Sequence, residues 1–508
     1  MPVIANPLKT KVKQKNIDIL QFCICIQAKT MNILEILTLV VLGFGLISVI
    51  TTRHSTLSII NAISSTLLAV MFIYIQTNTN LTPFIFGNFP NSIGIEHFID
   101  TTSYILISLF IPIGAYTLYT LIQEEHSDAI KYFTLFTTTV ICSSIIVIIT
   151  NDIFNFYVFL ELLVICIYLI FANTTDTQKK KNTLEYLLLG GISSVFIVLA
   201  IEIIYIIYGS LNVTVIFDKS PVLEKSQFIL LKISIIFLVI ASFIKLAIFP
   251  FTSWVRKIYT TCPNFFLPFY GSIVSSGISL YMVIFFLYKV IHNYQLLLFA
   301  SNIITPFCIA GILIFSVLSV KEKDLRVLLG YSTLAQVGYI YICITTPNIN
   351  AITGGILHII HNIIVKFGMF VILTQIYNTH KTYLLDSING LGQNIFIGIS
   401  LCIFSASLIG IPGTSGFISK FYMFQGLIEE KRFIALLAFI AGSVLNIIYL
   451  WRVISPMYFL PVLNKTKFTK TSIAAIIIAI GSTILFGIFT NFTLAKSQKI
   501  ATEFLQSL

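Results

Sequence analysis

The sequence places three lysines and one glutamate inside long apolar segments, where ionisable side chains are costly and usually functional. The lysines are Lys245, Lys366 and Lys420, and the acid is Glu161, in the middle of the apolar run 158–171. Burial in an apolar medium favours the neutral forms of lysines and carboxylic acids, whereas a neighbouring carboxylate restores a charged lysine. A lysine and a carboxylate that change their spacing would therefore exchange protons. These four residues predict a proton relay.

Two histidines share an apolar segment with one of these lysines. His358 and His361 precede Lys366 in the same run. Because His358, Asn362 and Lys366 are spaced four residues apart, they share one face of a helix, along which a water chain could run. We therefore include both histidines in the predicted relay. All three embedded cations are lysines, which suits proton transfer because arginine stays protonated.

Other interpretations of these residues stay open at this point. Glu161 and Lys245 could form a fixed structural ion pair, and an isolated histidine inside a membrane often only bonds to a neighbouring helix. The spread of three lysines and a glutamate over four segments favours the relay.

Two of the segments carry helix-breaking residues close to their lysine. The first has Pro250 five residues after its lysine, and the second has Pro412, Gly413 and Gly416 just before its lysine. Such breaks free backbone groups at membrane depth, where they need partners. Interrupted helices in both halves of a carrier point to its ion path. A packing kink is the alternative for either site alone.

The elements that position these residues must be membrane-spanning helices. Of the 508 residues, 57% are hydrophobic and only 10% are charged, whereas a soluble domain has about 25% charged residues. A spanning helix needs roughly 20 apolar residues. Fourteen segments meet this requirement: 31–50, 56–76, 99–121, 131–149, 153–172, 183–208, 229–251, 265–288, 296–319, 328–347, 351–377, 395–424, 433–460 and 472–494. We predict an all-α polytopic membrane protein with two inverted five-helix repeats that contain the broken helices.

The chain divides into four parts on this pattern. They are a basic extension or mis-assigned start at 1–30, N-terminal transmembrane helices at 31–130, a core of two repeats at 131–460, and a C-terminal helix and tail at 461–508. Lysine and arginine favour the loops of one side, which predicts that both ends of the bundle lie outside. The five lysines before Met31 oppose this rule. A surface segment or a start at Met31 would explain them, and we favour the second.

The remaining composition excludes several classes of function. The net charge of +11 comes from topology-setting residues in the loops, so we predict no nucleic-acid partner. The eight cysteines are mostly isolated in apolar runs and are expected to be small buried hydrophobic residues. We see no nucleotide-binding fingerprint, iron–sulfur cysteine cluster or haem motif. The sequence predicts no cofactor, no metal site and no catalytic residue in this chain.

Five stretches resemble the antiporter-like membrane subunits of respiratory complex I (subunits 2, 4 and 5) and of Mrp-type monovalent cation/proton antiporters. They are residues 151–161, 243–251, 323–339, 358–366 and 410–420. The resemblance implies that Glu161 and Lys245 form the first-half pair, that Lys366 lies in the second-half relay, and that Lys420 ends it. Gln336 and the histidine-rich approach to Lys366 are most similar to the D-type chain of Mrp antiporters.

Two features depart from the pattern of these subunits. Residues 265–288 contain no charged residue or histidine, where the family's eighth helix usually carries a lysine or histidine that links the halves. Ser275 and Ser276 lie near that position, and Asn362 stands where a second histidine is common. Hydroxyl groups hold water but do not store a proton at neutral pH. These departures put continuous proton transfer through the chain in question, but not the fold.

The resemblance implies a membrane subunit of a multisubunit antiporter that exchanges protons for Na⁺ or K⁺. Its partners would be other membrane subunits. We expect a bacterial inner (plasma) membrane rather than a mitochondrial one, because no arginine-rich presequence is visible. The alternatives are a proton-translocating subunit of NADH–quinone oxidoreductase (complex I), or a non-conducting assembly subunit. An unrelated protein such as a lipid-linked sugar flippase is disfavoured, because outer loops 77–98 and 209–228 lack a dense acidic or arginine cluster.

Overall fold

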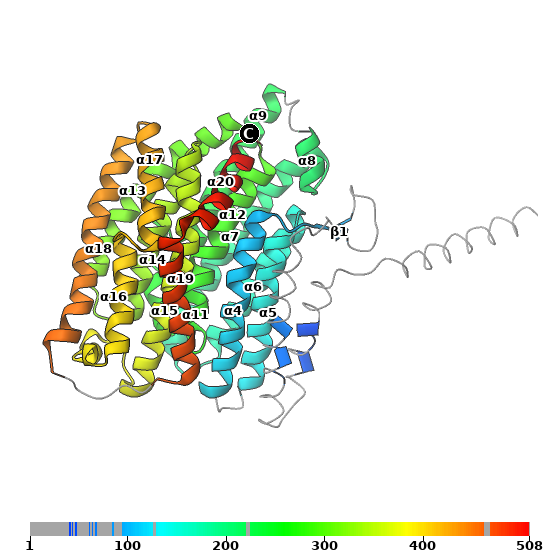
Figure 1. Cartoon of the computed structure of the whole chain (residues 1–508). Coiled ribbons are helices and arrows are strands. Elements are labelled where there is room, and N and C mark those ends of the chain that lie inside the picture. The colour runs from blue at the N-terminus through cyan, green and yellow to red at the C-terminus, as the bar shows by residue number, and fades with distance from the viewer. Residues whose placement is uncertain are drawn as a thin grey trace, which may run out of the picture.

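The computed structural model describes residues 94–124, 129–219, 224–461 and 468–506, with isolated residues between 40 and 85. In this part, long helices stand side by side, and the chain ends at the same end of the bundle as α8 (Figure 1). A two-residue antiparallel pair, β1 (Phe84–Ile85) with β2 (Glu96–His97), precedes the first long helix that is described in full. Eleven of the described helical segments are long and apolar enough to cross a membrane.

The helices follow one another with short connections. They are α4 (Thr101–Glu124), α5 (Ile130–Ile149), α6 (Ile153–Ala172), α7 (Thr177–Tyr208), α8 (Val213–Lys219), α9 (Lys225–Lys245), α10 (Val255–Thr261), α11 (Leu267–Phe269), α12 (Ser279–Ile284), α13 (Tyr294–Lys321), α14 (Leu325–Ile344), α15 (Ile349–His380), α16 (Ile395–Ile409), α17 (Ser415–Glu429), α18 (Phe433–Phe459), α19 (Lys470–Ile488) and α20 (Thr490–Gln506). Wide π-helical turns at Tyr270–Ile278 and Phe285–Val290 join α11 and α12 into one span, Leu267–Val290. Short 3₁₀ turns lie at Leu385–Ile388 and Leu391–Gln393.

The predicted all-α polytopic fold is confirmed. Twelve predicted spans coincide with described helices or helix pairs to within about six residues at the outer limits. The last one stops earlier than predicted, because α19 ends at Ile488 and a separate helix, α20, begins at Thr490. The predicted spans 31–50 and 56–76 and the basic segment 1–30 lie outside the residues that are described in full.

Two sets of five spans make up the core of the bundle. The first comprises α5, α6, α7, the α9–α10 pair and the span 267–290, and the second comprises α13, α14, α15, the α16–α17 pair and α18. The fourth member of each set is interrupted. Each helix of the second set comes five spans after its counterpart in the first set. Because five is an odd number, the two counterparts cross the membrane in opposite directions. This order gives the predicted inverted repeats.

Polar caps fix where many of the helices begin. Asp152 accepts a hydrogen bond from the backbone N–H of Asn155 at 2.7 Å, and Asn293 and Asn348 cap α13 and α15 in the same way. These side chains satisfy N–H groups that have no partner within the helix. At the other end, α7 stops at Gly209, whose φ of +64° suits glycine.

Helix α15 lies at the centre of the bundle. Every residue from Ala351 to Ile376 is buried, and α15 packs against α14, α16, α17, α19, α20 and the π-helical turn 270–278. The predicted relay residues on α15, His358, His361 and Lys366, therefore lie where protein, not lipid, surrounds them on all sides.

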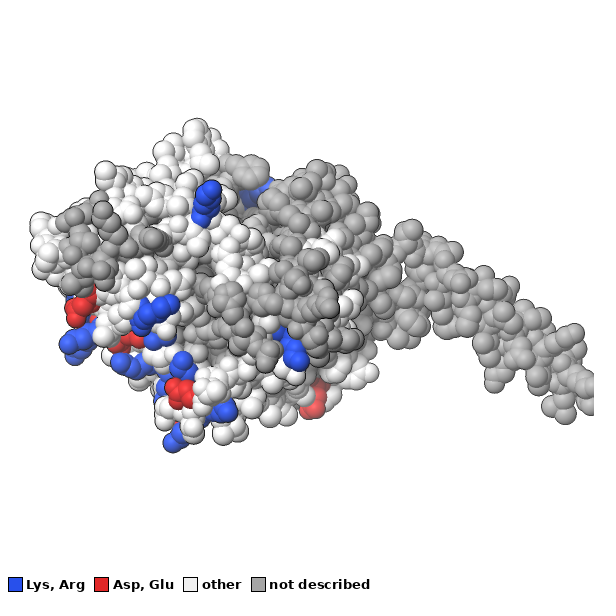
Figure 2. All heavy atoms as spheres, turned by 90° about the horizontal axis from the view of Figure 1, so that it is seen from below, with Lys and Arg blue, Asp and Glu red and all other residues white. Residues whose placement is uncertain are grey.

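The end of the bundle opposite the C-terminus carries many exposed basic side chains. Figure 2 shows this end of the bundle. Among the described residues visible there, Lys and Arg (blue) outnumber Asp and Glu (red). Exposed residues in the helix ends and loops on this side include Lys180, Lys181, Arg256, Lys321 and Lys323. This distribution is the one from which the sequence predicts the inner face, and we call this end the basic end.

Candidate proton-relay site

Glu161 and Lys245 form an ion pair in the interior of the first five-helix set. Glu161 projects from the middle of α6, and Lys245 is the last residue of α9. Lys245 Nζ lies 3.1 Å from Glu161 Oε1, and the two side chains are 8% and 20% exposed. Two of the sequence-predicted residues, separated by 84 positions, thus come into direct contact.

The helix break beside this pair lies where the sequence predicted it. Helix α9 ends at Lys245, and the chain continues without regular helix to α10, past Pro250. Ala247 adopts a φ of +52°, which is uncommon for a residue with a side chain. Lys245 therefore sits at a helix end, where the backbone carbonyls of the last turn favour a cation.

A small cavity adjoins Lys245. It has a volume of about 40 Å³, and its lining includes Tyr168, Tyr270, Ser275 and Ser279 as well as the lysine. A water molecule requires roughly 10–15 Å³ and polar partners. The cavity can therefore hold water next to the ion pair.

Lys366 is fully buried in the second five-helix set and has only neutral oxygen partners. Its Nζ donates to Ser332 Oγ at 2.7 Å and to the carbonyl oxygen of Leu329 at 3.2 Å, both on α14. Ser332 is also 2.6 Å from Tyr449 Oη on α18. In the part of the chain that the structure describes, no Asp or Glu forms an ion pair with Lys366.

Two histidines occupy the next turns of α15. His358 bridges two helices, because its Nε2 lies 2.8 Å from Gln336 Oε1 on α14 and its Nδ1 lies 2.8 Å from Ser419 Oγ on α17. His358 thus connects α15 to both α14 and α17. The ring centroid of His361 is 5.0 Å from that of His358.

The polar side chains next to these rings retain unused hydrogen-bonding capacity. His361 Nδ1 contacts the hydroxyls of Ser415 and Ser407 at 3.1 and 3.3 Å. Among the described residues, neither His361 Nε2 nor the amide atoms of Asn362 find a partner. Because buried polar groups are rarely left unpaired, these atoms mark places for water along the face that the sequence predicted.

Lys420 joins the two pieces of the second broken helix. Its Nζ donates to the carbonyl oxygens of Leu408 and Ile409 at 2.8 and 3.0 Å, at the end of α16. These are carbonyls that the break releases from helical hydrogen bonding. Lys420 therefore lies at the predicted interruption. It belongs to α17, the helix whose Ser415 and Ser419 contact His361 and His358.

Each predicted helix-breaking residue of this region has a distinct geometry. Gly413 has a φ of +89°, in the region that favours glycine. Gly416 lies against α16 so closely that a Cβ atom would sit 1.9 Å from the carbonyl oxygen of Ser407. Pro412 lies between α16 and α17, where no helical hydrogen bond is required.

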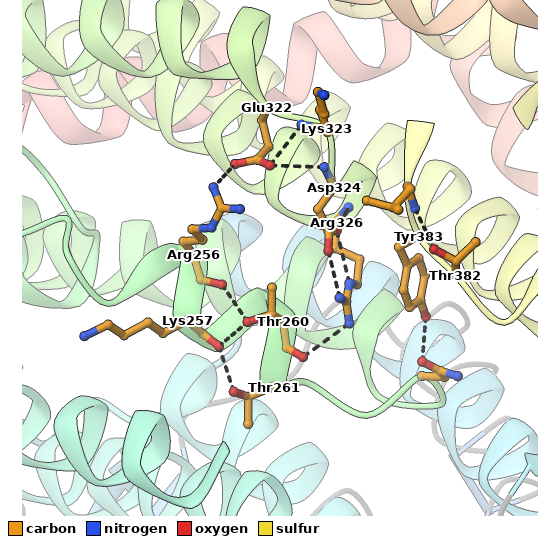
Figure 3. A network of polar contacts seen from close by, with 12 residues as sticks. Arg256, Lys257, Thr260, Thr261, Glu322, Lys323, Asp324, Arg326, Thr382 and Tyr383 are labelled. Carbon is orange, nitrogen blue, oxygen red and sulfur yellow. Dashed lines mark hydrogen bonds and ion pairs between the residues drawn. The ribbon is translucent and has the colours of Figure 1, made fainter. Parts of the chain in front are cut away.

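A polar network at the basic end ties the two five-helix sets together (Figure 3). Arg326 binds Asp324 through two contacts of 2.8 and 3.2 Å, donates to the carbonyl oxygen of Thr260 on α10, and stacks over the ring of Tyr383. Arg256 pairs with Glu322. These contacts join α10 to α14 at the start of residues 323–339, which carry part of the family resemblance. We call the contacts of Arg326 with Asp324 and Thr260 the clamp.

A polar cavity of about 840 Å³ opens beside this clamp. Its lining includes Lys179, Asn264, Arg326 and Lys381. Water and ions can approach the bundle from this end.

Among the described residues, no three His, Cys, Asp or Glu side chains gather as ligands for a metal ion.

Removing Arg326 is expected to destabilise the bundle. The Arg326→Ala variant leaves Asp324, whose side chain is 15% exposed, without its cation, and we expect a loss of roughly 1–3 kcal/mol in the free energy of unfolding. The measurement is the thermal midpoint of the purified protein in detergent. The matched control is Lys499→Ala, because the exposed Lys499–Glu503 pair should contribute only about 0–1 kcal/mol. Equal midpoints for the two variants would contradict the clamp.

The structure also contains a buried ion pair that sequence reasoning missed. Lys289 lies in the last turn of the span 267–290, 2.7 Å from Asp100, which immediately precedes α4. Lys289 also donates to Tyr281 Oη at 3.1 Å. One feature of the sequence could have indicated that Lys289 is buried. It lies inside an apolar run that continues to Ile291.

This pair predicts a specific dependence of stability on pH. Burial alone would raise the pKa of Asp100, but the Lys289 ammonium and hydrogen bonds from Ser103 outweigh it and hold the pKa below its usual value. A lowered carboxyl pKa contributes stability above the unfolded value of about 3.9, and this contribution is lost as the pH falls through the folded value. Wild type should therefore be more stable than Asp100→Asn at neutral pH.

The expected sign can be checked with thermal midpoints at several pH values. The difference between wild type and Asp100→Asn should shrink as the pH falls below about 4. Because all other titrating groups are common to both proteins, their effects cancel in the difference. If the difference in thermal midpoint stays constant down to the lowest pH measured, the charge of Asp100 contributes nothing to stability.

Comparison with known proteins supports this arrangement. Residues 150–446, more than half of the chain, match the family described as NADH:quinone oxidoreductase/Mrp antiporter, TM. NADH-quinone oxidoreductase subunit N of Desulforudis audaxviator (strain MP104C) is 29% identical over 319 residues, and the alignment covers 61% of each chain, less than two thirds of that relative. The D-type chain of the Na(+)/H(+) antiporter of Alkalihalophilus pseudofirmus is 26% identical over 400 residues, which cover 77% of this chain and 79% of that one.

The fold is shared with a solved multisubunit assembly. A chain of the Mrp complex from Dietzia sp. DQ12-45-1b superimposes with a TM-score of 0.78 at 16% identity, over 94% of this chain and 99% of that chain. The family match includes Glu161, both helix breaks and all three buried lysines. The chain is thus a multi-pass membrane protein that belongs to the NADH:quinone oxidoreductase/Mrp antiporter transmembrane family.

Proposed function

We propose that this chain is the proton-conducting subunit of a multisubunit monovalent cation/proton antiporter in a bacterial plasma membrane. The relative from the Na(+)/H(+) antiporter of Alkalihalophilus pseudofirmus, which aligns with 77% of this chain, supports this assignment. The observation that carries the proposal is the Lys245–Glu161 ion pair, 3.1 Å long, at a helix break inside the first five-helix set. Other membrane subunits of the same assembly are its partners.

The pair acts as a proton switch in this proposal. While Glu161 lies beside Lys245, the carboxylate favours the charged ammonium. A movement at the helix break, or a cation that approaches Glu161, weakens this attraction and releases the proton to water in the adjoining cavity. The helix end provides the mobility, because the residues after Lys245 lack regular helical hydrogen bonds.

The second half holds its proton differently. Lys366 and Lys420 lie on neutral oxygens rather than on a described carboxylate. The stabilisation of a buried ammonium by neutral oxygens is weaker than that by an opposite charge. A proton that reaches Lys366 can therefore leave again, through Asn362, His358 and His361, toward Lys420.

The test is cation-dependent loss of a transmembrane pH difference in inverted membrane vesicles. The host strain lacks its own antiporters and expresses the whole assembly with wild-type chain, Lys245→Ala or Glu161→Ala. Sodium or potassium should collapse the pH difference only with the wild-type chain. Equal responses of wild type and both variants, at equal amounts of folded protein, would refute the proposal.

A second candidate is a proton-translocating subunit of an NADH–quinone oxidoreductase. The relative named NADH-quinone oxidoreductase subunit N, at 29% identity, favours it. Both functions use the same relay but differ in what drives it. In the same vesicles, proton uptake that depends on NADH and quinone, and does not respond to sodium or potassium, would select this candidate over the antiporter.

A further inference from the structure

Tyr259 lies at the junction of the two five-helix sets. It belongs to α10, in the first set, and its ring lies against Gly330 of α14, where an added Cβ atom would be 2.6 Å from the ring. The ring stacks on Phe370 of α15 with centroids 5.9 Å apart, and meets Tyr270 edge-on at 5.6 Å. Both sets therefore hold this buried ring in place.

The hydroxyl of Tyr259 lies next to one hydroxyl group from each five-helix set. Ser275, in the first set, and Thr333, in the second, both lie next to it. The hydroxyl nevertheless makes no direct hydrogen bond among the described residues. A buried hydroxyl without a partner is costly, so this atom marks a place where water completes the contacts.

On the first side, Ser275 leads to the ion pair. It lines the cavity of about 40 Å³ that also contacts Lys245. This volume exceeds the roughly 10–15 Å³ that one water molecule requires. Water in the cavity can therefore contact Ser275 and Lys245 at once.

On the second side, Thr333 leads to Lys366. Thr333 Oγ1 donates to the carbonyl oxygen of Leu329 at 2.8 Å, and Lys366 Nζ donates to the same oxygen at 3.2 Å. Because both atoms lie on one carbonyl, they are near enough for a single water molecule to bridge them. Lys366 is thus the group on the second side that can accept or supply a proton.

We propose that Tyr259 is the link through which protons pass between Lys245 and Lys366. Its hydroxyl takes the place of the charged residue or histidine that is missing from residues 265–288. In each transfer, Oη accepts a proton from water on one side while its own O–H bond breaks toward the other side. The tyrosine is neutral before and after, and the net result is one proton moved from one lysine to the other. This inference rests on the proposed function.

The test uses the whole assembly in inverted vesicles and measures cation-coupled proton flux per folded complex. Tyr259→Phe keeps the ring, and Thr333→Val keeps the shape of the neighbouring side chain. We expect each to lower the flux at least about tenfold, and the double variant to be no slower than the slower single one, since both remove the same transfer. The matched control is Tyr288→Phe, which removes a buried hydroxyl that donates to Ile344 outside this path.

The outcomes separate this inference from the proposed function. If Lys245→Ala and Lys366→Ala stop the flux but Tyr259→Phe behaves like wild type, the link is wrong and the relay stands. Losses that multiply in the double variant would also overturn the link, because the two hydroxyls would then act independently. If both lysine variants conduct like wild type, the proposed function itself fails.

Discussion

Replacing Lys245 by arginine is expected to abolish cation-coupled proton flux while the protein stays folded. Arginine keeps the positive charge that pairs with Glu161, but it does not release a proton at physiological pH. A purely structural ion pair would accept this change, whereas a relay requires a group that can be deprotonated. We expect the flux to fall at least about 100-fold, as for the loss of a positioned acid or base.

The measurement is the initial rate of pH change in vesicles after addition of sodium or potassium. Lys257→Arg is the matched control, because Lys257 pairs with Glu185 at the basic end, outside the relay. It should conduct like wild type. Normal flux in Lys245→Arg would instead identify the Glu161–Lys245 pair as structural, which was the alternative that the sequence left open.

Replacing Gly416 by alanine is expected to disrupt the second half of the site. The new Cβ atom would lie 1.9 Å from the carbonyl oxygen of Ser407 and 3.0 Å from the ring of His361. Because the first contact is with backbone, α17 must move away from α16. This overpacking should cost about 3 kcal/mol or more of stability. It would also separate Lys420 from the carbonyl oxygens of Leu408 and Ile409.

Thermal midpoints and proton flux of the purified assembly report both effects. Gly481→Ala is the control, since this glycine lies within α19 and has open space around its Cβ position. There, alanine should be neutral or stabilise the helix by up to about 1 kcal/mol. If Gly416→Ala melts and conducts like Gly481→Ala, the close packing of the two half-helices is not required.

The sequence predicted the spans of the described residues and both helix breaks well, because both signals are local. Runs of about 20 apolar residues identify spans, and Pro250, Pro412 and Gly413 interrupt them through their own backbone constraints. The separate helix α20 was not predicted, because the residue that caps the end of α19 is Phe489 rather than a glycine or proline. Hydropathy alone did not indicate that end.

The partners of the site residues were harder to predict. Lipid and the interior of the bundle are both apolar, so hydropathy did not reveal that α15 is buried on every side. The partners of Lys366 and Lys420 are hydroxyl and carbonyl oxygens, which every helix has and which carry no sequence signature. The Asp100–Lys289 pair joins residues from distant helices. Only Glu161 and Lys245, rare charges in apolar runs, could be paired from sequence.

The most direct test of the account is proton movement by the purified assembly in proteoliposomes. An imposed sodium or potassium gradient drives exchange, and a trapped dye reports internal pH. We predict a cation-dependent pH change with the wild-type chain and none when Lys245 and Lys366 are both replaced by alanine. Proton movement at the wild-type rate in the folded double variant would contradict the claim that protons pass through this chain.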